Sequence, residues 1–222
     1  GALQMKPLNG TLVSFLLDQS KKDEVENAGI KYKTYTQVFE DEETGEDYEE
    51  EVIVINIKIS PPINEEEEER IILDDQEQEK IAQAHGLKSW EEWEWDFLIC
   101  PKDSLPPNEY WIGDLSGVNL DFFPENDYWF EGRGGIFESQ NGDFFALLKT
   151  HGGDGVYEDQ EGEPYPVDSG CIGCFPASAV STFIDQAKDS GSFIISACEL
   201  PVEYIEESGT IIYGDIEIAT KI

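Results

Sequence analysis

Residues 151–175 read HGGDGVYEDQEGEPYPVDSGCIGCF, and this stretch decides the fold of the second half of the chain. It contains six glycines. Glycine at this density indicates backbone positions with positive φ or with close approach of another chain segment. The simplest interpretation is a tight hairpin with one turn at residues 152–155 and a second at residues 159–162.

The rest of the second half also has the pattern of a β-rich domain. Short apolar and aromatic runs alternate with Gly, Asn and Asp, which is typical of strands separated by turns. The predicted strands cover residues 110–112, 135–138, 144–149, 165–168, 193–200, 202–206 and 210–220. The segment SAVSTFIDQA differs, because Val180, Phe183 and Ile184 recur at helical spacing and predict a helix over 178–188.

The first half contains three further runs that predict strands, at residues 11–17, 30–39 and 52–59. The acidic segment 41–51 joins the last two and predicts a long hairpin with its turn at Gly45. Residues 74–86 predict a helix. Trp90, Trp93 and Phe97 also recur at helical spacing, which predicts the buried side of a second helix. The glutamate run 65–69 is interpreted as a solvated loop or helix start.

These patterns together predict an α+β fold that is predominantly antiparallel β with a few short helices. Residues 1–103 are expected to hold the acidic hairpin and the helical segment, as a separate subdomain. Residues 104–222 are expected to form a β-rich domain with the glycine-rich stretch and the helix at 178–188.

The charge of the chain excludes several functions. Its 222 residues include 49 acids and 14 bases, for a net charge of -35. Residues 1–103 hold 27 acids and 10 bases (-17) and residues 104–222 hold 22 and 4 (-18), so both halves carry the charge. Such a chain repels phosphate backbones and anionic lipids, so no direct nucleic-acid or membrane binding is expected. An aromatic content of 12% indicates a folded core and not a disordered acidic tail.

The sequence also lacks the features of exported and membrane proteins. No apolar run approaches the roughly 18 residues of a membrane span. The first residues, GALQMKPLNG, show no signal-peptide pattern, although Gly1 also fits the scar of a removed leader or tag. Four cysteines in a chain of this length are not a disulfide scaffold. A cytoplasmic location is therefore predicted.

Two sets of residues could support chemistry. The glycine-rich loop 151–170 carries oxygen ligands that allow a calcium- or metal-stabilised module, namely Asp154, Asp159, Glu161, Glu163 and Asp168. Their spacing is not that of an EF-hand, and the stretch 151–175, with six acids in 25 residues, matches the acid content of the whole chain. A small hydrolase is the second alternative, with His151 as base, Cys171 as nucleophile and Asp168 as orienting acid.

The pair Cys171 and Cys174 has the CxxC spacing, but a zinc site needs further ligands and a redox site needs a following helix. Buried free thiols are the favoured interpretation, beside metal and redox alternatives. The sequence has no phosphate-binding or dinucleotide-binding glycine loop, so no cofactor is predicted. Taken together, these sequence features favour a protein that is not an enzyme.

The second half resembles an uncharacterised bacterial family, a domain of unknown function. The resemblance rests on Tyr110 to Asp114 (YWIGD), on the pattern GDGxYxDxxGxxYxVDSGxIG that begins at Gly153, and on the closing segment 209–218. It covers roughly residues 105–222. The resemblance implies a fold unit but no activity, and the sequence departs from the family pattern at residues 115–117.

The sequence therefore predicts a non-catalytic acidic binding protein that engages a basic protein partner, as an immunity-protein-like inhibitor or a DNA mimic does. The predicted contact residues are Asp154, Tyr157, Asp159, Glu161 and Asp168, with the run 65–69 as a second surface. The identity of the partner and the oligomeric state stay open.

Overall fold

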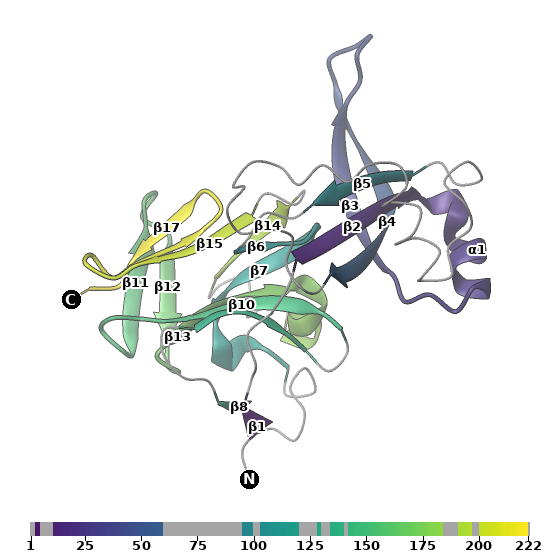
Figure 1. The fold of residues 1–222 in the computed structure, drawn as a ribbon. Helices are drawn as coiled ribbons and strands as arrows, with labels where there is room; N and C mark the ends of the chain where they lie inside the picture. Colours follow the sequence, from purple (N-terminus) through teal and green to yellow (C-terminus); the bar gives the residue numbers. More distant parts are fainter. Residues whose placement is uncertain are drawn as a thin grey trace, which may run out of the picture. The chain divides into compact units, whose positions relative to one another are not determined.

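The structure is a computed structural model in which residues 3–4, 11–59, 95–99, 103–119, 128–129, 134–139, 142–183, 191–196 and 200–221 are described (Figure 1). The chain divides into two compact units. Unit 1 comprises Gly1–Leu8, Lys102–Leu105 and Glu109–Ile222, and unit 2 comprises Asn9–Pro101 and Pro106–Asn108. The predicted division at 103/104 is a single cut, whereas each unit here consists of more than one segment.

Unit 2 is built on a four-stranded sheet in the order β3-β4-β2-β5. Its strands are β2 (Thr11–Asp18), β3 (Lys33–Glu40), β4 (Asp47–Ile59) and β5 (Trp95–Ile99). The β3–β4 hairpin pairs in register from Lys33 opposite Val54 to Glu40 opposite Asp47. The predicted strands and the turn at Gly45 are confirmed, because Gly45 has φ +70 and donates its N–H to the carbonyl of Asp41.

The sheet of unit 2 is buried on both faces at its centre. Val52 and Val54 pack with Tyr35 and Leu16 on one face, and the intervening Ile53 is fully buried on the other. A short 3₁₀ turn, η1 (Gln19–Lys21), and the helix α1 (Lys22–Asn27) follow β2. The sequence analysis did not predict either of them.

The prediction of a helix through Phe97 is wrong for the residues that the structure describes. Residues 95–99 form strand β5, in which Phe97 lies opposite Phe15 of β2. The segment Trp93, Trp95, Phe97 also has a two-residue period, and pairing with β2 selects that period over the helical one. The predicted helix at 74–86 and the run 65–69 lie outside the described residues.

Unit 1 contains a five-stranded sheet in the order β14-β7-β13-β10-β9. The strands are β7 (Asn108–Asp114), β9 (Gly134–Glu138), β10 (Phe144–Lys149), β13 (Cys171–Pro176) and β14 (Gly191–Ser196). Strand β13 lies at the centre, between β7 and β10, and all six of its residues are buried.

The second sheet of unit 1 has six strands in the order β12-β11-β17-β16-β15-β6. These are β6 (Ser104–Leu105), β11 (Gly155–Asp159), β12 (Pro164–Val167), β15 (Leu200–Ile205), β16 (Thr210–Tyr213) and β17 (Ile216–Ala219). Apart from the short parallel pair of β1 (Leu3–Gln4) with β8 (Tyr128–Trp129), the described registers are antiparallel. The predominantly antiparallel β prediction is thus confirmed.

One face of the five-stranded sheet carries a row of aromatic rings. Trp111 on β7 lies opposite Phe175 on β13, and Phe145 on β10 lies opposite Phe137 on β9. The rings of Phe175 and Phe145 stack and join the two pairs. Their ring centroids are 6.3, 5.6 and 5.6 Å apart along the row. Aromatic pairs at such distances add to the energy of burial, so this row anchors the core of unit 1.

The other face of the same sheet packs toward the six-stranded sheet. The Tyr213 hydroxyl of β16 donates to the carbonyl of Ile172 on β13 at 2.5 Å, and both side chains are fully buried. This hydrogen bond links the two sheets of unit 1. Burial raises the pKa of Tyr213 well above its usual range, so the phenol stays protonated and can donate.

Helical structure in the described residues is sparse. The predicted helix at 178–188 appears as a 3₁₀ helix, η5 (Ala177–Phe183), and its remaining residues are outside the described part of the chain. A second 3₁₀ turn, η2 (Leu115–Gly117), follows β7. Among the residues that are described, no helix has the length and apolar character needed to cross a membrane.

Candidate functional site

The five predicted contact residues lie on or beside the β11–β12 hairpin, but Tyr157 lies in the middle of β11 and the four acids lie at opposite ends of the hairpin. Asp154 and Asp168 flank the end where Gly155 pairs with Val167. Asp159 and Glu161 lie at the other end, beyond the pair of Glu158 with Pro164. With a rise of roughly 3.4 Å per residue, about 10 Å of strand separates the two groups. The hairpin therefore does not bring these acids together at one site.

Two of the five residues have their polar atoms occupied within the hairpin. Asp159 Oδ1 accepts the N–H groups of Glu161 and Glu163 at 2.9 and 3.0 Å, and its Oδ2 accepts the hydroxyl of Tyr165 at 3.0 Å. Tyr157 is buried and donates its hydroxyl to the carbonyl of Gly153 at 2.8 Å. Asp159 and Tyr157 thus build the turns, while Asp154, Glu161 and Asp168 are exposed.

The same geometry weakens the metal alternative. Across the described ranges of the chain, no group of three or more His, Cys, Asp or Glu side chains is placed to hold a metal ion. The one carboxylate on this hairpin with several close donors, Asp159, already accepts three hydrogen bonds.

The residues of the hydrolase alternative are not arranged for nucleophilic catalysis. Burial raises the pKa of Cys171 to about 11, with Lys149 opposing the shift and Asp114 and Asp154 adding to it. A nucleophilic thiol needs the opposite shift. His151 is exposed, and its described hydrogen bond is made by the backbone N–H, which donates to Thr220 Oγ1 at 2.9 Å.

The CxxC pair lies within strand β13 and not at the start of a helix. Residues three apart on a strand point to opposite faces, so Cys171 and Cys174 cannot approach each other or share a metal. Cys171 lies in the aromatic cluster, whereas Cys174 is fully buried on the other face, beside Tyr110 and Tyr213. Both are free thiols, and burial raises the pKa of Cys174 well above its usual range.

The sequence motif at residues 167–170 (VDSG) is held in place by hydrogen bonds to Asp114. This buried carboxylate accepts the N–H groups of Asp168 at 3.0 Å and Ser169 at 3.2 Å. The hydroxyls of Ser169 and Ser116 donate to it as well. Four hydrogen bonds satisfy the buried carboxylate and hold the turn that leads into β13. The motifs YWIGD and VDSG are therefore explained by a long-range structural contact, in which Asp114 of the first motif binds Asp168 and Ser169 of the second.

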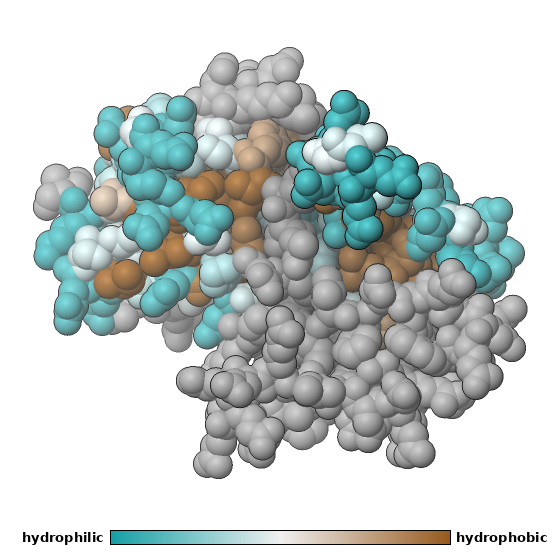
Figure 2. Space-filling view, turned by 90° about the horizontal axis from the view of Figure 1, so that it is seen from above, coloured by the Kyte–Doolittle hydropathy of each residue, from teal (hydrophilic) through white to brown (hydrophobic). Residues whose placement is uncertain are grey.

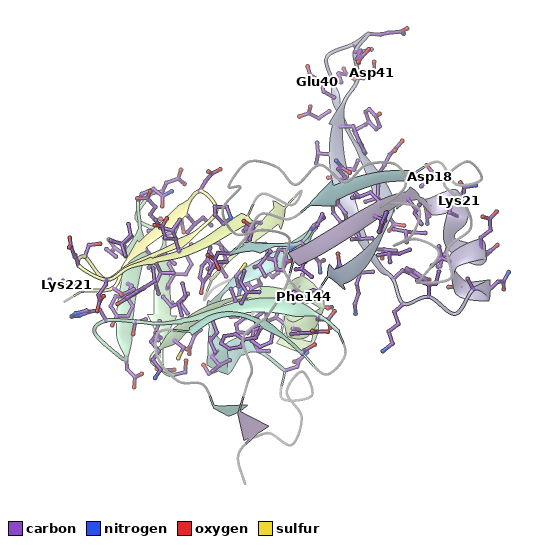
Figure 3. All side chains as sticks on the ribbon, in the orientation of Figure 1. Asp18, Lys21, Glu40, Asp41, Phe144 and Lys221 are labelled. Atoms are coloured by element: carbon purple, nitrogen blue, oxygen red, sulfur yellow. The ribbon has the colours of Figure 1, made fainter. Side chains whose placement is uncertain are left out.

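The strongest candidate surface is the acidic hairpin, defined as residues 40–51 at the far end of β3 and β4. Nine of its twelve residues are acids and none is basic. None of these acids forms an ion pair with a residue that the structure describes. Figure 3 shows Glu40 and Asp41 near the free end of this hairpin, and in Figure 2 hydrophilic residues gather over it.

The strand register of the acidic hairpin sorts its side chains by face. Because side chains alternate along each strand, Glu40, Asp47, Glu49 and Glu51 share one face with Val38. Val38 is 47% exposed, so this face presents an apolar spot among four carboxylates. On the opposite face Phe39 and Tyr48 stack with ring centroids 5.6 Å apart.

The turn of the acidic hairpin is rigidly built. Asp41 Oδ1 accepts the N–H groups of Glu43 at 2.8 Å and Thr44 at 3.3 Å. The backbone N–H of Asp41 donates to the carbonyl of Glu46 at 2.9 Å. Asp41 therefore has a structural role, because its side chain holds the backbone of the turn in place.

A second acidic feature lies at the base of the hairpin, within unit 2. A cavity of about 630 Å³ is lined by Asp18, Gln19, Ser20, Lys22, Asp23, Glu49, Glu50 and Glu51. Five of these eight side chains are acids and one is a lysine. Asp18 accepts the N–H of Ser20 at 2.8 Å, and this hydrogen bond lowers the pKa of Asp18. The acidic surface thus continues from the hairpin to its base.

The sequence pattern predicts this hairpin, but the predicted contact residues lie elsewhere, on the β11–β12 hairpin. The available signal was the density of acids in residues 40–51, which far exceeds the density of the chain as a whole. The second predicted surface, the run 65–69, lies outside the described residues.

The comparisons with other proteins add no relative to these observations. The chain matches no family model, no curated protein and no solved structure. The resemblance of residues 105–222 to an uncharacterised bacterial family stays a prediction, and the acidic hairpin is the surface on which a function can be argued.

Proposed function

We propose that this chain is a non-catalytic binding protein that engages a basic protein partner through the acidic hairpin of residues 40–51. The observation that carries the proposal is the set of nine acids without a described ion-pair partner. A cationic surface would supply the missing counter-charges. A nucleic acid or an anionic membrane would add like charge and is therefore a poor ligand.

The hairpin carries this charge at a cost to its own stability. Glu40 lies directly opposite Asp47, and like charges directly opposite one another destabilise an antiparallel pair. Local rules of sheet design are broken mainly at functional sites. The like-charge pair therefore favours a role in binding over a role in folding.

The charges of the hairpin can act together on an approaching partner. Neighbouring strands lie ~4.8 Å apart, which is within the ~8 Å screening length at physiological salt. A concentrated field of one sign raises association rates by about 10- to 1,000-fold. Val38 and Tyr48, 47% and 44% exposed, add apolar contact area on the two opposite faces of the β3–β4 hairpin.

Two classes of basic partner fit this surface, and they differ in what the partner normally binds. An immunity-protein-like inhibitor would cover a basic toxin, whereas a DNA mimic would occupy the DNA site of its partner. Competition by duplex DNA for the complex distinguishes the two classes, because only the second partner releases the chain when DNA is added.

The test is affinity capture from host lysate at low salt, followed by measurement of the affinity for each captured protein. The variant Glu42→Gln/Glu43→Gln/Glu46→Gln removes three charges from exposed positions of the acidic hairpin. A matched control, Glu158→Gln/Glu161→Gln/Glu163→Gln, removes three charges from the β11–β12 hairpin. We expect a partner of high pI whose affinity falls at least tenfold for the first variant and less than twofold for the control.

Two results would contradict the proposal. Equal losses in both variants would show that net charge alone governs binding. A larger loss in the control variant would return the contact surface to the β11–β12 hairpin, where the sequence first placed it.

A further inference from the structure

Among the residues that the structure describes, the sheet of unit 2 ends at β3. This strand is the last in the order β3-β4-β2-β5, and among the described strands only β4 pairs with it. In an antiparallel edge strand, every second residue points its backbone N–H and C=O away from the neighbouring strand. Half of the eight residues of β3 therefore direct both groups outward.

The other edge strands of the described sheets are shorter or protected. Strand β12 contains Pro164 and Pro166, strand β6 has two residues, and strand β9 begins with two glycines. Prolines and very short strands are common means of protecting an edge against pairing. Strand β3, with the sequence KTYTQVFE, contains no proline or glycine and is the longest of the described edge strands.

The backbone of β3 is also held in place. Tyr35 is 4% exposed and packs with Val52, Val54 and Leu16 in the core of unit 2. An edge anchored in this way needs little ordering on binding, which lowers the entropic cost of association.

The charges near this edge indicate which kind of chain segment could pair with β3. Val38 and Glu40 of β3 share a face with Asp47, Glu49 and Glu51 of β4. An added strand on that edge would lie beside Glu40, and the carboxylates of β4 would be about 10 Å away, within reach of long Lys or Arg side chains. A second copy of the chain would bring its own nine hairpin acids, whereas a segment rich in Lys or Arg would neutralise those present.

We propose that the basic partner docks by adding an extended segment to the β3 edge, with Lys or Arg residues alternating with apolar ones. This inference rests on the proposed function and names its binding mode. Backbone hydrogen bonds to β3 would supply affinity, as in other cases of strand addition. The alternating side chains would place cations on the face of the carboxylates and apolar groups on the opposite face, beside Phe39 and Tyr48.

The test uses the full chain and a synthetic octapeptide of alternating lysine and valine. Its control is the same peptide with an N-methyl group on every internal amide, which keeps the charge and removes the donors for strand pairing. We expect the unmodified peptide to bind at least tenfold more tightly. Amide hydrogen exchange of the complex should show protection at every second residue of β3, a pattern that charge attraction alone does not produce.

The other outcomes separate this inference from the proposed function. Equal affinities without alternating protection would overturn strand addition and leave the acidic hairpin as a charge-based site. Failure of both peptides to bind at low salt would count against the proposed function as well. Alternating protection of β3 that grows with protein concentration, without peptide, would assign the edge to a second copy of the chain.

Discussion

At the scale of single residues, Asp114 shows how a buried acid can be structural in so acidic a chain. Its side chain is 5% exposed and accepts hydrogen bonds from two backbone N–H groups and two hydroxyls. Hydrogen bonds to a charged group contribute more than neutral ones, at roughly 1.5–3 kcal/mol each. The fold therefore depends on this carboxylate far more than on the exposed acids around it.

The substitution Asp114→Asn should lower the free energy of unfolding by about 2–4 kcal/mol, because an amide –NH₂ would face N–H and O–H donors. Urea denaturation measures the change. Asp168→Asn is the control, since this side chain is exposed, and should change stability by less than about 0.5 kcal/mol. A loss in Asp168→Asn as large as that in Asp114→Asn would refute the structural role assigned to Asp114.

The two thiols of β13 give a prediction about pH. Burial raises the pKa of Cys171 from 9.0 to about 11, so the native state keeps a proton that the unfolded chain releases. Stability from this group is present in full below pH 9 and is lost as the pH rises toward 11.

Replacement of Cys171 by alanine should therefore flatten the fall in stability between pH 9 and 11 by about 1–3 kcal/mol. Packing losses would lower stability at every pH and leave this slope unchanged. Chemical denaturation at half-unit pH steps measures the slope. An identical slope in wild type and Cys171→Ala would show that the thiol titrates alike in both states.

At the scale of elements, the aromatic row of the five-stranded sheet depends on glycines beside it. A Cβ added at Gly113 would lie 2.2 Å from the Trp111 ring, and one added at Gly117 would lie 2.6 Å from it. On β13, a Cβ at Gly173 would lie 2.3 Å from the Phe175 ring. The rings lean over these glycines, so Gly113 and Gly173 within their strands and Gly117 at the end of η2 are all part of the packing.

The substitution Gly113→Ala should thus destabilise unit 1 by about 3 kcal/mol or more, because the indole cannot move without displacing its neighbours. Gly45→Ala tests positive φ alone, since nothing lies within 4 Å of its added Cβ, and should cost only about 1–2 kcal/mol. In the double variant Trp111→Phe/Gly113→Ala the two losses should be less than additive, because the smaller ring leaves room. Full additivity in denaturation experiments would argue against this contact.

The hairpin of β3 and β4 gives a second prediction at this scale. Changing Glu40 to lysine replaces the like-charge pair with Asp47 by an opposite-charge pair, which should stabilise unit 2 by about 0.2–1 kcal/mol. Glu42→Lys makes the same change of charge in the turn and serves as the control. Thermal unfolding at low salt should rank Glu40→Lys above Glu42→Lys, and the reverse order would contradict the strand register.

At the scale of the whole molecule, the net charge of -35 affects stability through self-repulsion. Salt should raise the melting temperature, because ions screen repulsion between carboxylates that have no cation beside them. The hairpin variant Glu42→Gln/Glu43→Gln/Glu46→Gln should be more stable than wild type by about 0.5–1 kcal/mol at ~10 mM salt. At ~0.5 M salt the difference should vanish. A difference that persists at high salt would require a cause other than charge.

The sequence was most informative about strands and charge. An apolar, β-branched run predicted β2, two-residue periodicity predicted β3 and β4, and a glycine between acids predicted the turn at Gly45. It was misleading where one segment fitted two periods, as at β5, and at η5, where the described part of the predicted helix is 3₁₀. The contact residues were chosen by glycine and acid content, which marked the turns of the β11–β12 hairpin.

By itself, the sequence determined the strand-forming segments, the acidity of both halves and the hairpin that concentrates it, because these follow from local patterns and composition. Only the tertiary structure decided which residues distant in the sequence contact one another. Pairing with β7 and β10 placed β13 at the centre of a sheet and its two thiols on opposite faces. Folding across 54 residues brought Asp114 to the N–H of Asp168. Local sequence patterns indicate which side chains can be buried. Long-range strand pairing determines which other side chains they pack against.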